Sequence, residues 1–227
     1  MIFTVLKYVF IALFAAFSAV HLYHSWKDDA PKRAKTKPFL LIFLLLFYLA
    51  ASLSARTAVS WVLAGALLMS WLGDVLLIPK GNKWFVFGGI AFLASHILFV
   101  LAYVPSVDFR AVIWYIWAPA LVVYYGISVA VTLSLRKTTP KPMLVPMVLY
   151  LFANSTMNLF ALARLMTLKT PGSAIAYAGA ILFFISDCTL YLVRYHKNRE
   201  LIFKKHFTVM LTYLLGEALI TVGILLA

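Results

Sequence analysis

The sequence is poor in charge, and this sets the class of protein. Only 12% of its 227 residues are charged and 64% are hydrophobic, whereas an average soluble domain has about 25% charged residues. Polar side chains are too few to cover the surface of a soluble globule of this length. The composition excludes an ordinary soluble protein and predicts that apolar surface faces lipid.

Cysteine and acidic residues are also scarce. The single cysteine, Cys188, lies within an apolar run, so an intramolecular disulfide is impossible and a cysteine-based metal site is not indicated. Only seven residues are Asp or Glu, and the formal net charge is +13. The basic residues lie in short groups between apolar runs and form no continuous basic face, which argues against binding of nucleic acid. We interpret them as charges that set membrane topology.

Long hydrophobic runs dominate the chain. About 20 apolar residues are needed to span the hydrocarbon core of a bilayer as a helix. Eight runs approach this length, at residues 2–24, 38–54, 58–78, 85–105, 111–135, 142–167, 173–195 and 206–226. The first has no basic residues ahead of it and is too long for a signal peptide, so we expect it to remain as a membrane helix. The tight connection around residues 54–57 predicts a helical hairpin between the second and third runs.

The loops between these runs are too short to separate two domains. The sequence therefore predicts an all-α polytopic membrane protein, a bundle of about eight transmembrane helices forming a single domain over residues 1–227. The first, third, fifth and seventh loops carry 15 of the 20 Lys and Arg residues, and the even loops carry four. Because basic residues are enriched in cytoplasmic loops, we expect both termini on the non-cytoplasmic side. We expect the membrane to be the cytoplasmic (inner) membrane of a bacterium.

Three acidic residues lie inside the predicted spans, namely Asp74, Asp187 and Glu217. An ionisable side chain at membrane depth costs at least about 2.5 kcal/mol and is a candidate functional group for that reason. Asp74 and Asp187 occur on spans that run in the same direction, five to seven residues before the predicted cytoplasmic ends. Both carboxyl groups are therefore expected roughly 7 to 10 Å inside that boundary. Each follows a small residue, Gly73 or Ser186, which permits close helix packing.

Two carboxyl groups at one depth in a partly dry site can supply one acid and one base. The alternatives are that Asp74 and Asp187 join helices through hydrogen bonds, or that they relay protons or cations. Glu217 is expected either to add a third polar wall or to pair with His96, for which a buried pair without chemistry is the simpler interpretation. Asn154 and Asn158 lie one turn apart on one face of the sixth span, where they bind substrate head groups or join helices.

A set of short strings, taken in order over nearly the whole chain, resembles the YhhN-type lysoplasmalogenases, a family of multi-span membrane proteins. The strings are Lys37-Pro38, Gly73-Asp74, Gly88 to His96 continuing to Tyr103, Ser186-Asp187, and Tyr213 with Gly216-Glu217. Glu217 departs from the family, in which we expect glutamine more often at this position. The resemblance implies hydrolysis of the vinyl ether bond of lysoplasmalogens to a fatty aldehyde and a glycerophospho-choline or glycerophospho-ethanolamine.

Vinyl ether hydrolysis fits a pair of carboxyl groups. One carboxylic acid protonates the alkene carbon remote from the ether oxygen, and one carboxylate stabilises the resulting cation or activates water. We assign these roles to Asp74 and Asp187 without deciding which is which, and we expect no metal and no organic cofactor. The lipid tail is expected between helices, with the head group toward the cytoplasmic face. Candidates for head-group contact or orientation are Lys37, His96, Tyr103, Asn154, Tyr213 and Glu217.

The expected partners are a lysophospholipid substrate and the surrounding membrane lipids. One competing hypothesis is a proton-coupled transporter of small solutes or lipids that uses the same acids. A second is a helical scaffold in which the aspartates are structural. Release of aldehyde by the purified protein would separate the enzyme from both.

Overall fold

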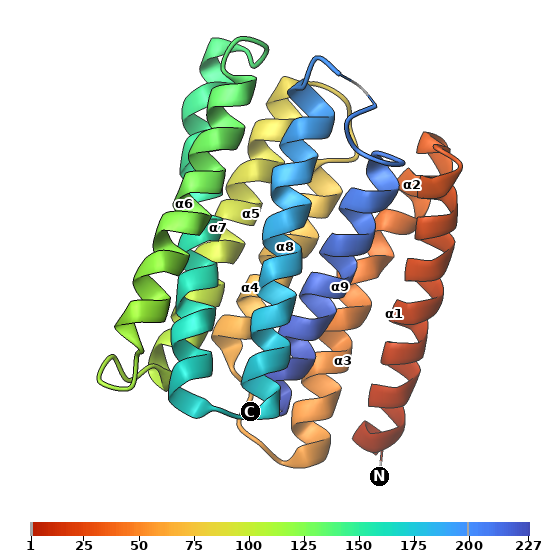
Figure 1. Cartoon of the computed structure of the whole chain (residues 1–227). Helices are drawn as coiled ribbons and strands as arrows, with labels where there is room; N and C mark the ends of the chain where they lie inside the picture. The colour runs from red at the N-terminus through yellow and green to blue at the C-terminus, as the bar shows by residue number, and fades with distance from the viewer. Residues whose placement is uncertain (1, 199) are drawn as a thin grey trace. The chain divides into compact units, whose positions relative to one another are not determined.

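The computed structural model describes residues 2–198 and 200–227, and all the regular elements in these ranges are helices. Arg199, which the charge count above includes, lies outside the described residues. Figure 1 shows the elements in chain order. They are α1 (Ile2–Trp26), α2 (Ala30–Thr36), η1 (Lys37–Phe39), α3 (Leu40–Ala55), α4 (Trp61–Leu76), α5 (Asn82–Tyr103), η2 (Val104–Ser106), α6 (Trp114–Leu135), α7 (Lys141–Leu168), α8 (Pro171–Tyr195) and α9 (His206–Leu225).

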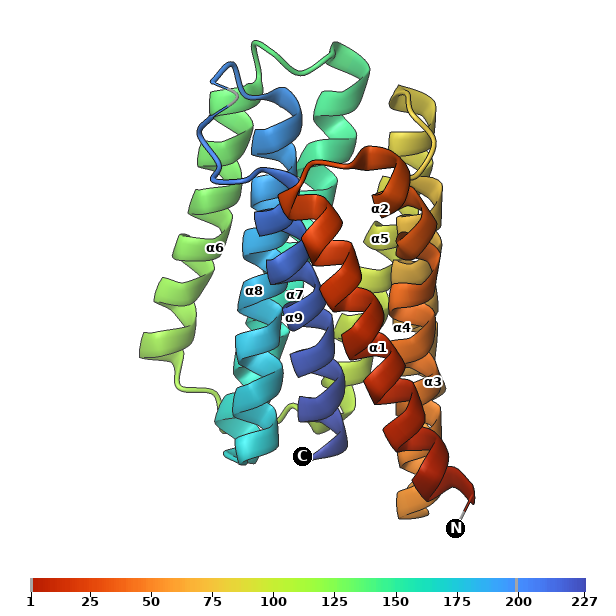
Figure 2. The same ribbon diagram turned by 90° about the vertical axis from the view of Figure 1, so that its right-hand side faces the viewer.

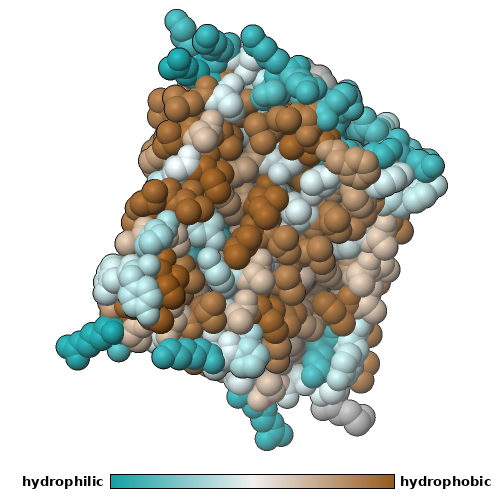
Figure 3. Space-filling model, in the orientation of Figure 1, coloured by the Kyte–Doolittle hydropathy of each residue, from teal (hydrophilic) through white to brown (hydrophobic). Residues whose placement is uncertain are grey.

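The predicted all-helical membrane architecture is confirmed. Seven helices in the described part of the chain are long and apolar enough to cross a membrane, counting Ala30–Ala55 and Asn82–Ser106 as one span each. On the face drawn in Figure 3, hydrophobic side chains cover the middle of the helices and hydrophilic ones gather at helix ends. This pattern matches an apolar solvent around the helices and water at their ends.

The third predicted run, residues 58–78, forms a shorter helix than expected, α4. Helix α4 has 16 residues, a length of about 24 Å against roughly 30 Å of hydrocarbon. It begins only at Trp61, because the chain before it is extended and the Ser60 side chain accepts a hydrogen bond from the Leu63 amide as its N-cap. The side of the membrane on which the termini lie stays a prediction.

Inter-residue contacts divide the chain into two compact units, Met1–Ala102 and Tyr103–Ala227. The first holds α1 to α4 and nearly all of α5, and the second holds η2 and α6 to α9. Within the first unit, α1 packs beside α3 (Figure 2), and the hydroxyls of Thr4 and Ser54 lie 2.9 Å apart where the two helices meet. The single transmembrane domain predicted from the sequence stays a prediction.

A helix fills much of the first loop, where the sequence analysis expected a break. The Asp29 carboxylate accepts a hydrogen bond from the Lys32 amide at 3.1 Å, and Pro31 stands in the first turn of α2, two features that start a helix. The helix tightens to the 3₁₀ form of η1 at Pro38, which has no amide hydrogen to donate. Its carbonyl instead accepts a bond from the Trp71 indole at 2.8 Å, which fastens η1 to α4.

The hairpin predicted between the second and third runs is present. Helix α3 ends at Arg56, which adopts the left-handed conformation with φ of 56° and so turns the chain back. The Tyr48 hydroxyl then accepts a hydrogen bond from the Ser60 amide at 2.8 Å and donates one to the Ser60 carbonyl at 3.3 Å. These bonds tie the end of the connection to α3.

The tightest helix contact of the second unit joins α8 to α9 along a line of glycines. A Cβ atom added at Gly172, Gly179, Gly216 or Gly223 would lie between 2.3 and 2.9 Å from backbone atoms of the facing helix. The glycines are seven residues apart on each helix, which keeps them on one face. Only hydrogen fits there, so the register of α8 against α9 is fixed.

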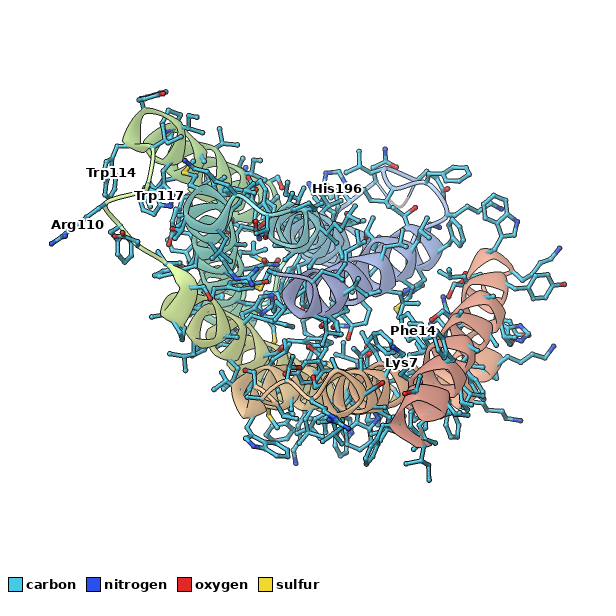
Figure 4. All side chains as sticks on the ribbon, turned by 90° about the horizontal axis from the view of Figure 1, so that it is seen from below. Lys7, Phe14, Arg110, Trp114, Trp117 and His196 are labelled. Atoms are coloured by element: carbon cyan, nitrogen blue, oxygen red, sulfur yellow. The ribbon has the colours of Figure 1, made fainter. Side chains whose placement is uncertain are left out.

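Aromatic residues anchor the start of α6 in the second unit. Figure 4 shows Trp114 and Trp117 close together there, while Arg110 projects away from the helices. The two indole rings lie edge to face with centroids 5.4 Å apart, and the Trp117 indole donates to the Leu159 carbonyl of α7 at 3.1 Å. Tryptophan is enriched at the interface between membrane and water, where its ring contacts apolar groups and its N–H reaches a polar group.

Candidate active site

Asp74 lies in the last turn of α4 and is only 2% exposed. Close packing of α5 against this turn depends on Gly73, because a Cβ atom there would lie 2.5 Å from the Phe92 ring. The small residue before the acid therefore permits close packing, as the sequence analysis expected. The consequence is a carboxyl group held in a dense interior, where charge is poorly solvated.

Lys37 is the cationic partner of this acid. Its Nζ atom lies 3.0 Å from Oδ1 of Asp74, and the lysine side chain is 15% exposed. Asp74 and Trp71 are three residues apart on one face of α4, and both bind η1. Asp74 pairs with Lys37, and the Trp71 indole donates to the Pro38 carbonyl. The sequence analysis expected Lys37 to contact the head group and did not predict this ion pair.

His96 lies on α5 in the same unit and is fully buried. Its Nδ1 atom is 2.7 Å from the Phe92 carbonyl, and a carbonyl only accepts, so the proton of this bond belongs to Nδ1. The neighbouring Ser95 joins α5 to α4 by bonds to the Ser70 hydroxyl at 2.7 Å and to the Ala66 carbonyl at 2.9 Å. The pairing of His96 with Glu217 stays a prediction.

Asp187 is 4% exposed on α8 and is held from α7. The Asn154 amide donates a hydrogen bond to its Oδ2 atom at 2.6 Å. Asn158 in turn donates to the side-chain oxygen and to the carbonyl of Asn154, both at 3.0 Å. The two asparagines predicted to share a face therefore form a relay that fixes the Asn154 amide and orients the acid.

Two tyrosines that sequence reasoning missed lie near Asp187. The Tyr150 side chain lies within hydrogen-bonding range of the Asp187 carboxyl group, and Tyr191 lies within its electrostatic reach. The two tyrosine rings are 5.6 Å apart. A signal for Tyr150 was available, because it precedes Asn154 by four residues and so lies on the same face of α7.

Glu217 and two further candidates also lie in the second unit. Glu217 is fully buried on α9 and lies within electrostatic reach of Tyr103 and Tyr150. Tyr103 is fully buried beneath Arg164, whose guanidinium carbon lies 6.0 Å from the tyrosine ring centroid. Tyr213 packs against Phe183, with ring centroids 5.4 Å apart. The second unit thus gathers Asp187, Asn154, Glu217, Tyr103 and Tyr213, while Asp74, Lys37 and His96 belong to the first.

The arrangement defines a polytopic helical membrane protein in which each unit buries an aspartate beside groups that bind it. Among the described residues, no three His, Cys, Asp or Glu side chains are grouped as metal ligands are. The model of the YhhN family matches residues 32–224, and the chain belongs to this family, the family of the lysoplasmalogenases. Its membrane function is therefore of the lysoplasmalogenase type, and family membership supports a membrane hydrolase.

The match confirms the resemblance seen in the sequence and spans every string that carried it, from Lys37 to Glu217. No curated protein and no solved structure shows significant similarity to the chain.

Proposed function

We propose that this protein hydrolyses the vinyl ether bond of lysoplasmalogens, releasing a fatty aldehyde and a glycerophospho-head group, with Asp74 and Asp187 as its catalytic acids. The observation that carries the proposal is the pair of contacts that hold these acids, the Lys37 ammonium on Asp74 and the Asn154 amide on Asp187. An intramembrane acid with a dedicated partner is a typical functional group of membrane proteins. Membership of the lysoplasmalogenase family supplies the substrate class.

The reaction divides into proton transfer and addition of water. A carboxylic acid protonates the alkene carbon remote from the ether oxygen, which leaves an oxocarbenium-like cation on the adjacent carbon. Water attacks that carbon and loses a proton to a carboxylate, which gives a hemiacetal. The hemiacetal hydroxyl then loses its proton to the first carboxyl group, which is now a carboxylate, while the second carboxyl group, now protonated, gives its proton to the glycerol oxygen. The bond to that oxygen breaks and the fatty aldehyde leaves. Both carboxyl groups return to their starting states, as general acid–base catalysis requires.

The surroundings of the two acids support different roles. An ion pair needs an ionised carboxylate, so Asp74 beside Lys37 suits the group that stabilises the cation or takes the proton from water. Asp187 then donates the proton. The Asn154 amide donates to Oδ2 of Asp187, so the acidic proton of Asp187 belongs on Oδ1.

The proposed setting is the inner membrane of a bacterium, where the substrate is a lysophospholipid drawn from the bilayer. The purified protein in detergent, incubated with a lysoplasmalogen and assayed for fatty aldehyde, tests the activity. Sustained release without any ion gradient supports the hydrolase. Uptake of solute by proteoliposomes, with no aldehyde formed in either preparation, would replace it with the transporter alternative.

A further inference from the structure

Arg164 is a buried cation on a membrane-spanning helix. It lies four residues before the end of α7 and is only 5% exposed. Its Nη1 atom is buried without a hydrogen-bond partner among the described residues. A guanidinium group does not lose its proton in proteins, so α7 keeps a positive charge inside an apolar span.

The contacts of Arg164 offset only a fraction of the cost of burying it. Tyr103 presents its ring to the guanidinium at 6.0 Å, and no carboxylate of the described residues forms a salt bridge with it. A cation–π contact recovers less free energy than the dehydration of an arginine requires. An anionic ligand would complete the site.

We propose that Arg164 binds the phosphate of the lysophospholipid, with Tyr103 against one face of the guanidinium. This inference rests on the proposed function, because that function supplies the phosphodiester. The planar fork of a guanidinium matches two phosphate oxygens at once, which a lysine ammonium does not. Arg164 is thus assigned to substrate binding, whereas the sequence analysis counted it only as a topology charge.

The polar groups of α7 follow the order of the groups in the substrate. Asn154 holds the acid that would protonate the vinyl ether. One turn later, Oδ1 of Asn158 is buried without a partner among the described residues and is placed to accept from the free glycerol hydroxyl. Arg164 follows about 9 Å further along the axis and about 120° around it, and its side chain, which is longer than that of Asn158, reaches further back toward the N-terminus.

This order turns the head group toward the Leu168 end of α7. The sequence analysis expected it toward the cytoplasmic face, which under the predicted topology is the opposite end. The direction of the bound lipid is therefore a new prediction. Of the basic residues in the described chain, only Arg164 is used to derive it.

The test is a comparison of lipid affinities that needs no turnover. The probes are an ester-linked lysophosphatidylethanolamine, which has no vinyl ether to hydrolyse, and a monoacylglycerol with the same acyl chain but no phosphate. Binding to the full chain is measured by tryptophan fluorescence or thermal shift for wild type and for Arg164→Gln, Arg164→Lys and Arg110→Gln. Arg110 is the matched control, because it is an exposed arginine in the loop that Thr167 fastens to the same end of α7.

We expect wild type and Arg110→Gln to bind the phospholipid at least about 10-fold more tightly than the monoacylglycerol. Arg164→Gln should lose this preference, and Arg164→Lys should keep only a fraction of it. Equal affinity of wild type for the two lipids overturns the proposal even if Arg164→Gln does not fold. Displacement of the phospholipid by millimolar inorganic phosphate would overturn it in favour of a free-phosphate site. Preference for the phospholipid without aldehyde release from lysoplasmalogen would reject the hydrolase and keep the phosphate site.

Discussion

Lys37 and Asp74 form an ion pair with 3.0 Å between Nζ and Oδ1, in which Asp74 is buried and the lysine side chain is 15% exposed. The residues are far apart in the sequence, and they meet because the 3₁₀ turn of η1 places Lys37 against the last turn of α4. Neither partner is well solvated, so each depends on the other for compensation of its charge. The pair therefore links the stability of the first unit to the ionised state of a candidate catalytic acid.

Removal of the lysine should destabilise the protein strongly. Lys37→Met leaves the Asp74 carboxylate buried without its cation, and loss of one partner of a buried pair costs about 3 to 5 kcal/mol. Thermal unfolding in detergent measures this loss, and Lys37→Met/Asp74→Asn should recover much of it. Lys35→Met, at an exposed position of α2, is the control. Additive effects of the two single substitutions would show that the pair is not coupled.

Both aspartates should be required for aldehyde release. Asp74→Asn and Asp187→Asn keep the size of each side chain and remove its acid chemistry, so kcat should fall by about 10²- to 10⁴-fold. The assay is aldehyde formation from lysoplasmalogen by folded, purified protein. Asp108→Asn, in an exposed loop of the second unit, should retain wild-type activity. Full activity of both catalytic variants would eliminate the acid–base assignment.

The asparagine relay should act on kcat more than on KM. Asn154→Ala removes the amide that donates to Asp187 at 2.6 Å. This hydrogen bond strengthens as Asp187 gives up its proton and becomes charged, and a hydrogen bond to a charged group is worth about 10- to 100-fold in rate. Asn158→Ala reaches Asp187 only through Asn154, so kcat should fall less, and loss of its proposed contact with the glycerol hydroxyl should appear in KM. Steady-state kinetics in detergent provide both constants. An Asn154→Ala enzyme with raised KM and unchanged kcat would assign this residue to substrate binding.

The glycine line between α8 and α9 should tolerate no side chain. A Cβ atom in Gly179→Ala would lie 2.6 Å from the Ile220 amide nitrogen, and overpacking of this kind costs about 1 to 3 kcal/mol. Gly126→Ala on α6 is the contrast, because nothing lies within 4 Å of the added atom, so it should be neutral or slightly stabilising. Thermal unfolding of both variants makes the comparison, and equal midpoints would contradict the packing described.

Asp29 should show a pH dependence that is local to α2. The Lys32 amide and side chain both donate to its carboxylate, which lowers the pKa of Asp29 below 3.8. A lowered pKa in the folded state means that this contribution to stability is present at neutral pH and is lost as the pH falls through that value. Carboxyl NMR of the full chain should place the titration midpoint of Asp29 below the ordinary value of an aspartate. An ordinary aspartate midpoint would argue against the helix cap.

The sequence predicted the spans well because membrane helices are specified locally, by runs of apolar residues. It failed at α2, where three basic residues and a proline suggested a loop although Asp29 could cap a helix. It also predicted too long a helix at α4, because the apolar run starts at residue 58, before the N-cap Ser60 at which the helix begins. Hydropathy does not register either of these capping effects.

The candidate acids were also predictable, because an aspartate in an apolar span is conspicuous in one dimension. Their partners were not. Lys37 and Asp74 are separated by 37 positions in the sequence, and Asn154 and Asp187 by 33. Only the packing of helices brings such pairs together. Arg164 shows the same limit, because a basic residue near the end of a span indicates topology until its burial is known.

The glycine line of α8 and α9 has a consequence for how a lipid enters the second unit. The proposed hydrolase takes its substrate from the bilayer, so an acyl chain has to pass between two of its helices. The backbones of α8 and α9 are in contact along this line, so an acyl chain cannot pass between them. The two helices, which carry Asp187 and Glu217, therefore act as one rigid pair. We therefore expect the acyl chain to enter this unit beside that pair, along α6, which contacts α7 and α8 through the ring pairs Tyr125–Phe152 and Tyr124–Phe184.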